Sequence, residues 1–244
     1  MDPHSSRRGD DAASPAGRLG LHRAGGLVHP HESDGPRMTT DPWLWLLQAN
    51  DTAYPSGSYA HSFGLEELVE AGVVKTAADL EQFIGKQVLP ALLTFEIPFF
   101  AKAHAAAIAG NLDDLLDLDA ELDAWRIPAE LRDASRRIGS QRLDLLAQLD
   151  PSPLVTEYRS RSPRSHHLVV TALELSALPV GHAARAFSFQ AVASLAAASM
   201  KLMRVGQTAC QLVVRRSLAA LGEQIDNSLS RPADGWFNPL LEIA

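Results

Sequence analysis

Cysteine is nearly missing from this sequence: Cys210 is the single thiol among 244 residues. One cysteine excludes an internal disulfide and a zinc site built from several thiolates. This usage is typical of a protein from a reducing compartment, so we expect a cytoplasmic protein. Cys210 itself is expected to be a small buried apolar group.

Long apolar runs and basic blocks are also lacking. Proline, glycine or charge interrupts every hydrophobic stretch before it reaches the roughly 20 residues that a membrane-spanning helix needs, and the first residues do not have the pattern of a secretory signal. The net charge is -7 at pH 7, with no cluster of lysine and arginine. Because nucleic acids and anionic membranes bind basic patches, we expect neither as a partner.

The alternation of apolar and polar residues that marks a strand is missing, and hydrophobic residues recur at helical spacing instead. We therefore predict an all-α, single-domain bundle of about 8–10 helices, with kinked or broken long helices, over residues 38–244. Residues 1–37 are rich in glycine, proline, serine and charge and have few large apolar side chains. They are predicted to form a disordered N-terminal extension.

Several helix boundaries follow from the sequence. Asp41 before Pro42 predicts an N-cap for a short apolar helix, which we expect to be buried. Pro90 and Pro98 lie inside a helical pattern and should kink or split it. The other predicted helices cover residues 112–125, 129–149, 154–159, 166–178, 180–189 and 190 to about 221, the last interrupted at residues 205–206.

A shaped turn at residues 50–66 separates two apolar helical runs. Pro55 fixes its own backbone angle, while Gly57 and Gly64 permit angles that other residues avoid. Aromatic side chains crowd this turn, and it carries little charge. Two interpretations are open: a tight connection buried for packing, or a rigid loop that presents a surface to a partner.

Residues 55–66 resemble the N-terminal signature of the urease accessory protein F (UreF) family, Pro-x-Gly-Ser-Tyr-x-His-Ser-Phe-Gly-Leu-Glu. Residues 130–139 resemble a second pattern of the family, Glu-Leu-Arg-x-Ala-x-x-x-Leu-Gly, with Ile138 in place of the leucine. The likeness is weaker at residues 204–211, where Cys210 stands in place of a usual glycine.

The resemblance implies a non-enzymatic, homodimeric chaperone without a stably bound cofactor. With UreD (UreH) and the GTPase UreG, such a protein promotes GTP-dependent incorporation of nickel into apo-urease, and the complex handles the nickel. In the family a C-terminal tail is implied to dock on UreD, and the tail of this chain is expected to be truncated. The residues implied in shape and partner contact are Pro55, Gly57, Tyr59, His61, Glu66, Arg204, Gly206 and Gln207.

An enzyme is the alternative hypothesis. Asp113, Asp114 and Asp117 match the Asp-Asp-x-x-Asp pattern with which helical prenyl-diphosphate enzymes hold Mg²⁺. Such a site needs a second acidic cluster facing the first, and the sequence offers no comparable one. An acidic, solvated helix face is therefore the favoured interpretation.

Histidine chemistry leaves one further alternative. His61 could brace the loop through a hydrogen bond or offer its imidazole to nickel across a dimer interface. Bracing is favoured because no second ligand lies at a suitable spacing, and calorimetry on His61→Ala would test nickel binding. His166 and His167 are adjacent, so on a helix they diverge by about 100° and do not suit one shared metal; we expect them to be partly buried or at the surface.

Overall fold

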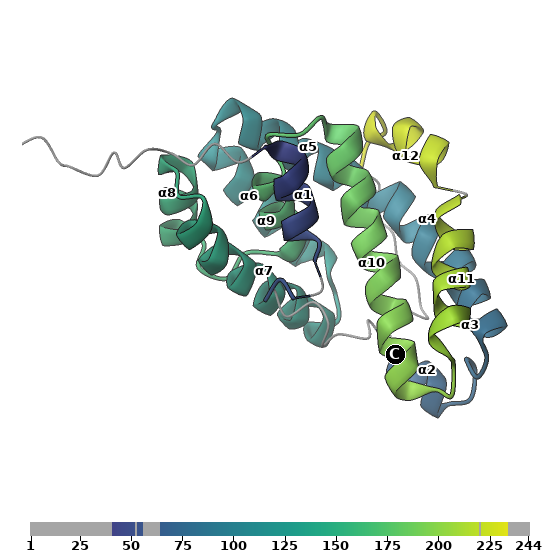
Figure 1. Cartoon of the computed structure of the whole chain (residues 1–244). Coiled ribbons are helices and arrows are strands. Elements are labelled where there is room, and N and C mark those ends of the chain that lie inside the picture. Colours follow the sequence, from purple (N-terminus) through teal and green to yellow (C-terminus); the bar gives the residue numbers. More distant parts are fainter. Residues whose placement is uncertain (1–40, 52, 56–63, 220, 234–244) are drawn as a thin grey trace, which may run out of the picture. The chain divides into compact units, whose positions relative to one another are not determined.

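The computed structural model describes residues 41–51, 53–55, 64–219 and 221–233. All regular structure in these ranges is helical, which confirms the all-α prediction (Figure 1). The predicted disorder of residues 1–37 lies outside the described residues. The helical segments, in chain order, are α1 (Pro42–Ala49), α2 (Leu65–Glu70), α3 (Ala77–Phe83), η2 (Ile84–Val88), α4 (Leu89–Ala91), η3 (Leu92–Glu96), α5 (Ile97–Ala109), α6 (Leu112–Trp125), α7 (Ala129–Leu149), α8 (Pro153–Arg161), α9 (His167–Glu174), α10 (Val180–Leu202), α11 (Gln207–Ala219) and α12 (Gly222–Leu229).

Helix α1 begins as predicted but is not buried as predicted. The carboxylate of Asp41 accepts a hydrogen bond from the backbone N–H of Trp43 at 2.8 Å, and Pro42 follows at the first helical position. Within α1 only Trp45 and Ala49 are buried. Leu44 keeps 62% of its surface exposed, and Trp43 and Leu47 are also exposed. The expectation of burial was wrong because only one face of this short, mostly apolar helix packs against the other described residues.

Residues 77–109 form one continuous helical stretch that contains two π-helical segments, η2 and η3. Segment η2 ends two residues before Pro90, and η3 ends two residues before Pro98. A proline ring clashes with the carbonyl four residues earlier in an α-helix. The wider π turns lie at those carbonyls, so the stretch stays continuous where the sequence predicted a kink or a split.

The same stretch, Ala77–Ala109, is long and apolar enough to cross a membrane by length and composition alone. More than half of its most apolar part is buried inside the protein. A core helix of a globular protein has the same properties, so this finding is weak evidence for a membrane span.

Helix α10 corrects a predicted boundary. We expected separate helices at residues 180–189 and from residue 190, but α10 runs unbroken from Val180 to Leu202. No glycine or proline lies near residue 190 to end the first helix. The predicted interruption at residues 205–206 is confirmed, since α11 begins at Gln207.

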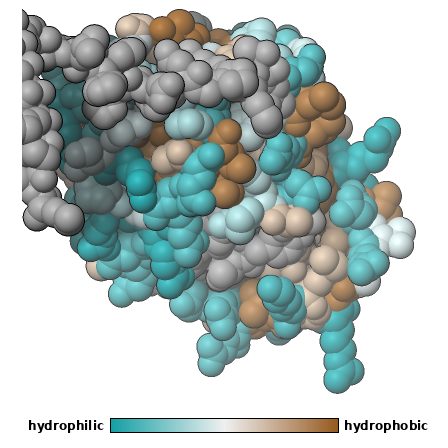
Figure 2. All heavy atoms as spheres, turned by 60° about the vertical axis from the view of Figure 1, so that its left-hand side comes forward, coloured by the Kyte–Doolittle hydropathy of each residue, from teal (hydrophilic) through white to brown (hydrophobic). Residues whose placement is uncertain are grey.

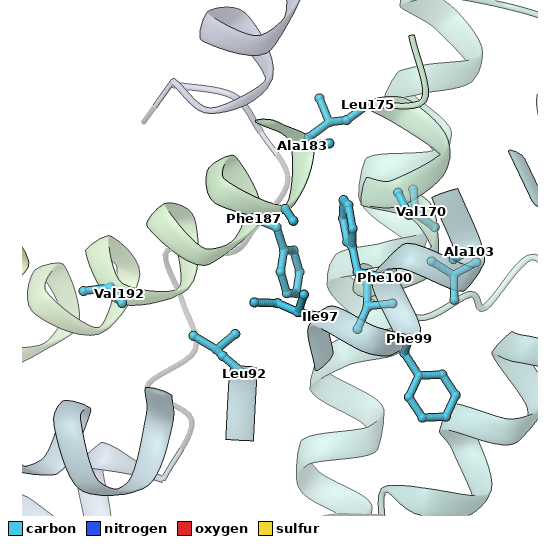
Figure 3. Close-up of a cluster of buried hydrophobic side chains, with 14 of the residues drawn as sticks. Leu92, Ile97, Phe99, Phe100, Ala103, Val170, Leu175, Ala183, Phe187 and Val192 are labelled. Carbon is cyan, nitrogen blue, oxygen red and sulfur yellow. The ribbon is translucent and has the colours of Figure 1, made fainter. Parts of the chain in front are cut away.

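The hydrophobic core forms where α5 packs against α6, α9 and α10. Figure 3 shows Phe100 of α5 and Phe187 of α10 facing each other beside Ile97, and their ring centroids lie 5.2 Å apart. Figure 1 shows α10 between two groups of helices: α7, α8 and α9 lie on one side, and α3, α11 and α12 on the other. Residues of α10 therefore take part in both halves of the bundle.

On the outside, hydrophobic groups of the described residues form separate patches among hydrophilic side chains on the face shown in Figure 2. The large apolar side chains with the greatest exposure are Leu47, Ile127, Ile108, Leu44 and Val73. Leu44 and Leu47 share α1, while the other three lie on α5 or on connections between helices.

Candidate partner-binding site

A buried polar cluster lies at the start of the predicted loop. Its centre is Arg142 of α7, whose side chain is fully buried and forms an ion pair with the equally buried Glu174 of α9. We call Arg142, Glu174, Tyr54, Gln190 and the groups that bond to them from α1 the Arg142 cluster. Full burial of a charged pair is costly unless further hydrogen bonds satisfy the remaining atoms.

All three nitrogens of the Arg142 guanidinium donate hydrogen bonds. Its Nε donates to a carboxylate oxygen of Glu174. Its Nη1 donates to Oε1 of Gln190 on α10 at 3.2 Å, and its Nη2 donates to the carbonyl oxygen of Ala49 at 3.2 Å. The guanidinium also lies over the ring of Tyr54, 5.3 Å from its centroid. Arg142 thus joins α7 to α9, α10, the end of α1 and the first residues of the loop.

Glu174 completes the cluster from the opposite side. The hydroxyl of Tyr54 donates to its second carboxylate oxygen, and Nε1 of Trp45 donates to its backbone carbonyl at 3.1 Å. Burial, reinforced by the carboxylate of Glu174, raises the pKa of Tyr54. The phenol therefore stays protonated and remains a hydrogen-bond donor.

Neither Arg142 nor Glu174 was predicted from the sequence to be a site residue. The sequence did contain one local indication of the burial of Arg142. Arg142 lies four residues after Ile138 and four before Leu146, so it belongs to the buried face of α7. A charge on the apolar face of a helix indicates a buried partner. Its partner lies 32 residues away in the sequence, and local patterns do not reveal it.

The predicted loop residues are only partly described. Pro55 is exposed and directly follows the buried Tyr54. Gly64 has φ of 81°, a left-handed angle that favours glycine, as the sequence analysis expected. Gly57, Tyr59 and His61 lie outside the described residues, so both interpretations of His61 stay predictions.

The other predicted contact residues are exposed at one end of the bundle. Glu66 lies in the first turn of α2, while Arg204 and Gly206 precede α11, which begins at Gln207. A β-carbon placed on Gly206 would meet no atom within 4 Å, so space does not require a glycine there. Helix α2 packs against α10 and lies beside its C-terminal end in Figure 1. The structure therefore places Glu66 and residues 204–207 at the same end of the bundle.

The acidic motif is a solvated helix face, as favoured from the sequence. Asp113, Asp114 and Asp117 are exposed on α6, and Nη1 of Arg161 donates to Oδ1 of Asp113 at 3.1 Å. Within the described ranges, no group of three or more histidine, cysteine, aspartate or glutamate side chains is placed to hold a metal ion.

His166 contradicts its predicted position, because its side chain is fully buried. It caps α9 rather than lying within it, and its backbone N–H donates to Oδ1 of Asp119 at 2.7 Å. Its Nδ1 lies 3.1 Å from the hydroxyl of Ser135, and its Nε2 lies 3.3 Å from a carboxylate oxygen of Asp123. Burial and the nearby charge of Arg126 lower the pKa of His166 to about 4.

This pKa predicts a loss of stability in weak acid. The unfolded histidine takes up a proton below its ordinary pKa of 6.5, whereas the folded ring stays neutral until about 4. In that window the unfolded state binds more protons, so His166 should lower the free energy of unfolding by about 2 kcal/mol between pH 7.5 and pH 5. Urea unfolding at both pH values checks this, and His166→Gln should show a smaller loss. Equal losses would contradict the assignment.

The second sequence pattern, at residues 130–139, ends in Gly139, and the packing around this residue requires a glycine. A β-carbon at this position on α7 would lie 2.0 Å from the carbonyl oxygen of Ser165 and 2.7 Å from backbone atoms of His166 and His167. Only a residue without a side chain allows the backbone before α9 to approach α7 so closely. This contact places α9, with Glu174 at its end, against Arg142 of α7.

Comparisons with known proteins agree with the motifs. The sequence model of the UreF family matches residues 74–218. The chain is 30% identical over 217 residues to the urease accessory protein UreF of Arthrobacter sp. (strain FB24), an overlap of 82% of this chain and 90% of that protein. It is also 30% identical over 209 residues to the urease accessory protein UreF of Escherichia coli O157:H7, covering 84% and 93%. The chain therefore belongs to the UreF family of urease accessory proteins.

Proposed function

We propose that this chain is a non-enzymatic cytoplasmic chaperone of urease maturation. In this proposal it forms a homodimer and joins UreD (UreH) and the GTPase UreG in a complex that inserts nickel into apo-urease. Nickel is the cargo of the complex, and this chain acts as the adaptor between the other proteins. Membership of the UreF family supports the proposal.

The position of Tyr54 in the Arg142 cluster supports a partner contact near the signature. Tyr54 directly precedes the signature at residues 55–66, and the Arg142 cluster ties it to buried groups of α7 and α9. Fixing one end of a segment lowers the entropy cost of ordering that segment when it binds a partner. Glu66 and Arg204, at the end of the bundle where α2 meets α10, then provide exposed charges of opposite sign for a partner.

Co-expression with the cognate UreD and UreG, followed by size-exclusion chromatography with light scattering, tests the proposal. We expect one complex that contains two copies of this chain and activates apo-urease when nickel and GTP are supplied. Elution of this chain alone, with no urease activation, would contradict the adaptor function.

A charge reversal locates the contact. Arg204→Glu should weaken the complex by about tenfold, because it replaces an exposed cation with an anion at the proposed interface. Arg215→Glu makes the same change at an exposed position within α11 and should leave the complex intact. Equal complex formation by the two variants would show that Arg204 is not part of the interface.

A further inference from the structure

The described residues line a cavity of about 120 Å³ that the proposed adaptor function does not use. Its walls come from the π-helical stretch, the end of α6, and one face each of α7, α9 and α10. Most of the lining is apolar or aromatic: Val88, Ala91, Leu92, Phe95, Trp125, Leu131, Ile138, Leu168, Phe187, Ala191 and Leu195.

The charged groups of the lining neutralise each other. Nη2 of Arg126 pairs with a carboxylate oxygen of Glu96 at 3.0 Å. Two uncharged polar groups of the lining also have hydrogen-bond partners. The hydroxyl of Ser135 is hydrogen-bonded to Nδ1 of His166, and Oε1 of Gln190 accepts a hydrogen bond from Arg142. The cavity therefore has no net charge to attract an ion, and a neutral ligand suits it better.

His167 supplies a specific polar atom. The hydroxyl of Thr171 donates its hydrogen to the backbone carbonyl of His167 at 2.7 Å, and the same oxygen lies 3.3 Å from Nδ1 of the imidazole. Since that hydrogen is already used, the hydroxyl oxygen accepts from Nδ1, and the proton of a neutral ring lies on Nδ1. Nε2 is then an acceptor, and no residue in the described ranges hydrogen-bonds to it.

The neutral form of this imidazole is the one that the surroundings favour. Burial, reinforced by the charges of Arg142 and Arg126, lowers the pKa of His167 well below its usual value. The ring of His167 also lies beside that of Phe187, with centroids 5.9 Å apart. A flat ligand in this cavity would therefore meet aromatic faces and edges together with one unprotonated nitrogen.

We propose that this cavity binds a neutral, single-ring aromatic molecule with one O–H or N–H group, which donates a hydrogen bond to Nε2 of His167. The size agrees with this class, because an apolar cavity of about 150 Å³ in another protein binds benzene. A predominantly apolar lining with a few polar groups, here Nε2 of His167, the unpartnered Nε of Arg126 and the hydroxyl of Ser194, is typical of a small-molecule site.

Phenol and toluene are matched probes, because they differ by a hydroxyl in place of a methyl group. We expect both to bind the full chain in calorimetric or NMR titrations, with phenol about fivefold tighter because it alone donates a hydrogen bond. In His167→Leu the preference for phenol should disappear while toluene still binds. No binding of either probe at millimolar concentration would overturn the proposal.

Filling the cavity provides an independent test. Ala191→Leu adds three carbon atoms to the lining and should abolish binding of both probes, as should Ser194→Val if the first variant does not fold. Ala105→Leu makes the same change as the first variant at an exposed position of α5 and should bind as the parent does. Unchanged binding by a folded cavity-filling variant would place the probes elsewhere and overturn the proposal.

Discussion

Replacing Arg142 with methionine is expected to lower the free energy of unfolding by about 3–5 kcal/mol, because the carboxylate of Glu174 stays buried without its cation. The change also removes the hydrogen bonds to Gln190 and to the carbonyl oxygen of Ala49. Buried acceptors that lose their donors add to the loss. Urea unfolding followed by circular dichroism at pH 7.5 measures it.

The double variant Arg142→Met with Glu174→Gln separates burial of a lone charge from loss of packing. It removes both charges, keeps an acceptor for Tyr54, and should recover more than half of the stability lost in the single variant. Arg159→Met is the matched control, since Arg159 pairs with Asp144 at 2.7 Å but both side chains are more than half exposed. It should cost less than about 1 kcal/mol. Equal losses in Arg142→Met and Arg159→Met would show that burial does not govern the pair.

The features that the sequence predicted correctly are local. The carboxylate of Asp41 caps α1, as predicted, by accepting hydrogen bonds from the backbone N–H groups of Trp43 at 2.8 Å and Leu44 at 3.2 Å. Each of these interactions joins residues within one helical turn, so the residue types and their spacing specify it without knowledge of the fold.

The features that the sequence analysis missed or misplaced depend on packing between distant segments. Nη2 of Arg142 bonds to an oxygen 93 residues away, and Nε1 of Trp45 bonds to one 129 residues away. The burial of His166 and the exposure of Leu44 likewise depend on what lies over them. Composition and periodicity show that a helix has an apolar face, but the tertiary fold decides what covers that face.

The same distinction between local patterns and long-range packing applies to the predicted site. Glu66 and Arg204 came from motifs in the sequence, yet nothing in those motifs showed that α2 packs against α10 and brings them to the same end of the bundle. The motif ending in Gly139 was visible as a pattern. Its cause, a backbone crossing 26 residues further along the chain at Ser165, was visible only in three dimensions.

Gly139→Ala should lower the free energy of unfolding by about 3 kcal/mol, although alanine is the better helix former. The added β-carbon would lie 2.0 Å from a backbone oxygen that belongs to Ser165, so relief requires α7 and the segment before α9 to move apart. Overpacking of this kind costs about 1–3 kcal/mol or more when rigid backbone must shift. Chemical denaturation with tryptophan fluorescence measures the loss.

Gly85→Ala is the matched control, because a β-carbon on this exposed residue of η2 meets no atom within 4 Å. There the same change should stabilise the protein by up to about 1 kcal/mol through the reduced entropy of the unfolded chain. Movement of α7 in Gly139→Ala would also pull Arg142 away from Glu174. If the proposed complex with UreD forms, this variant should therefore weaken it more than its loss of stability explains. If it binds UreD as well as Gly85→Ala does, the close approach of α7 to α9 serves stability alone.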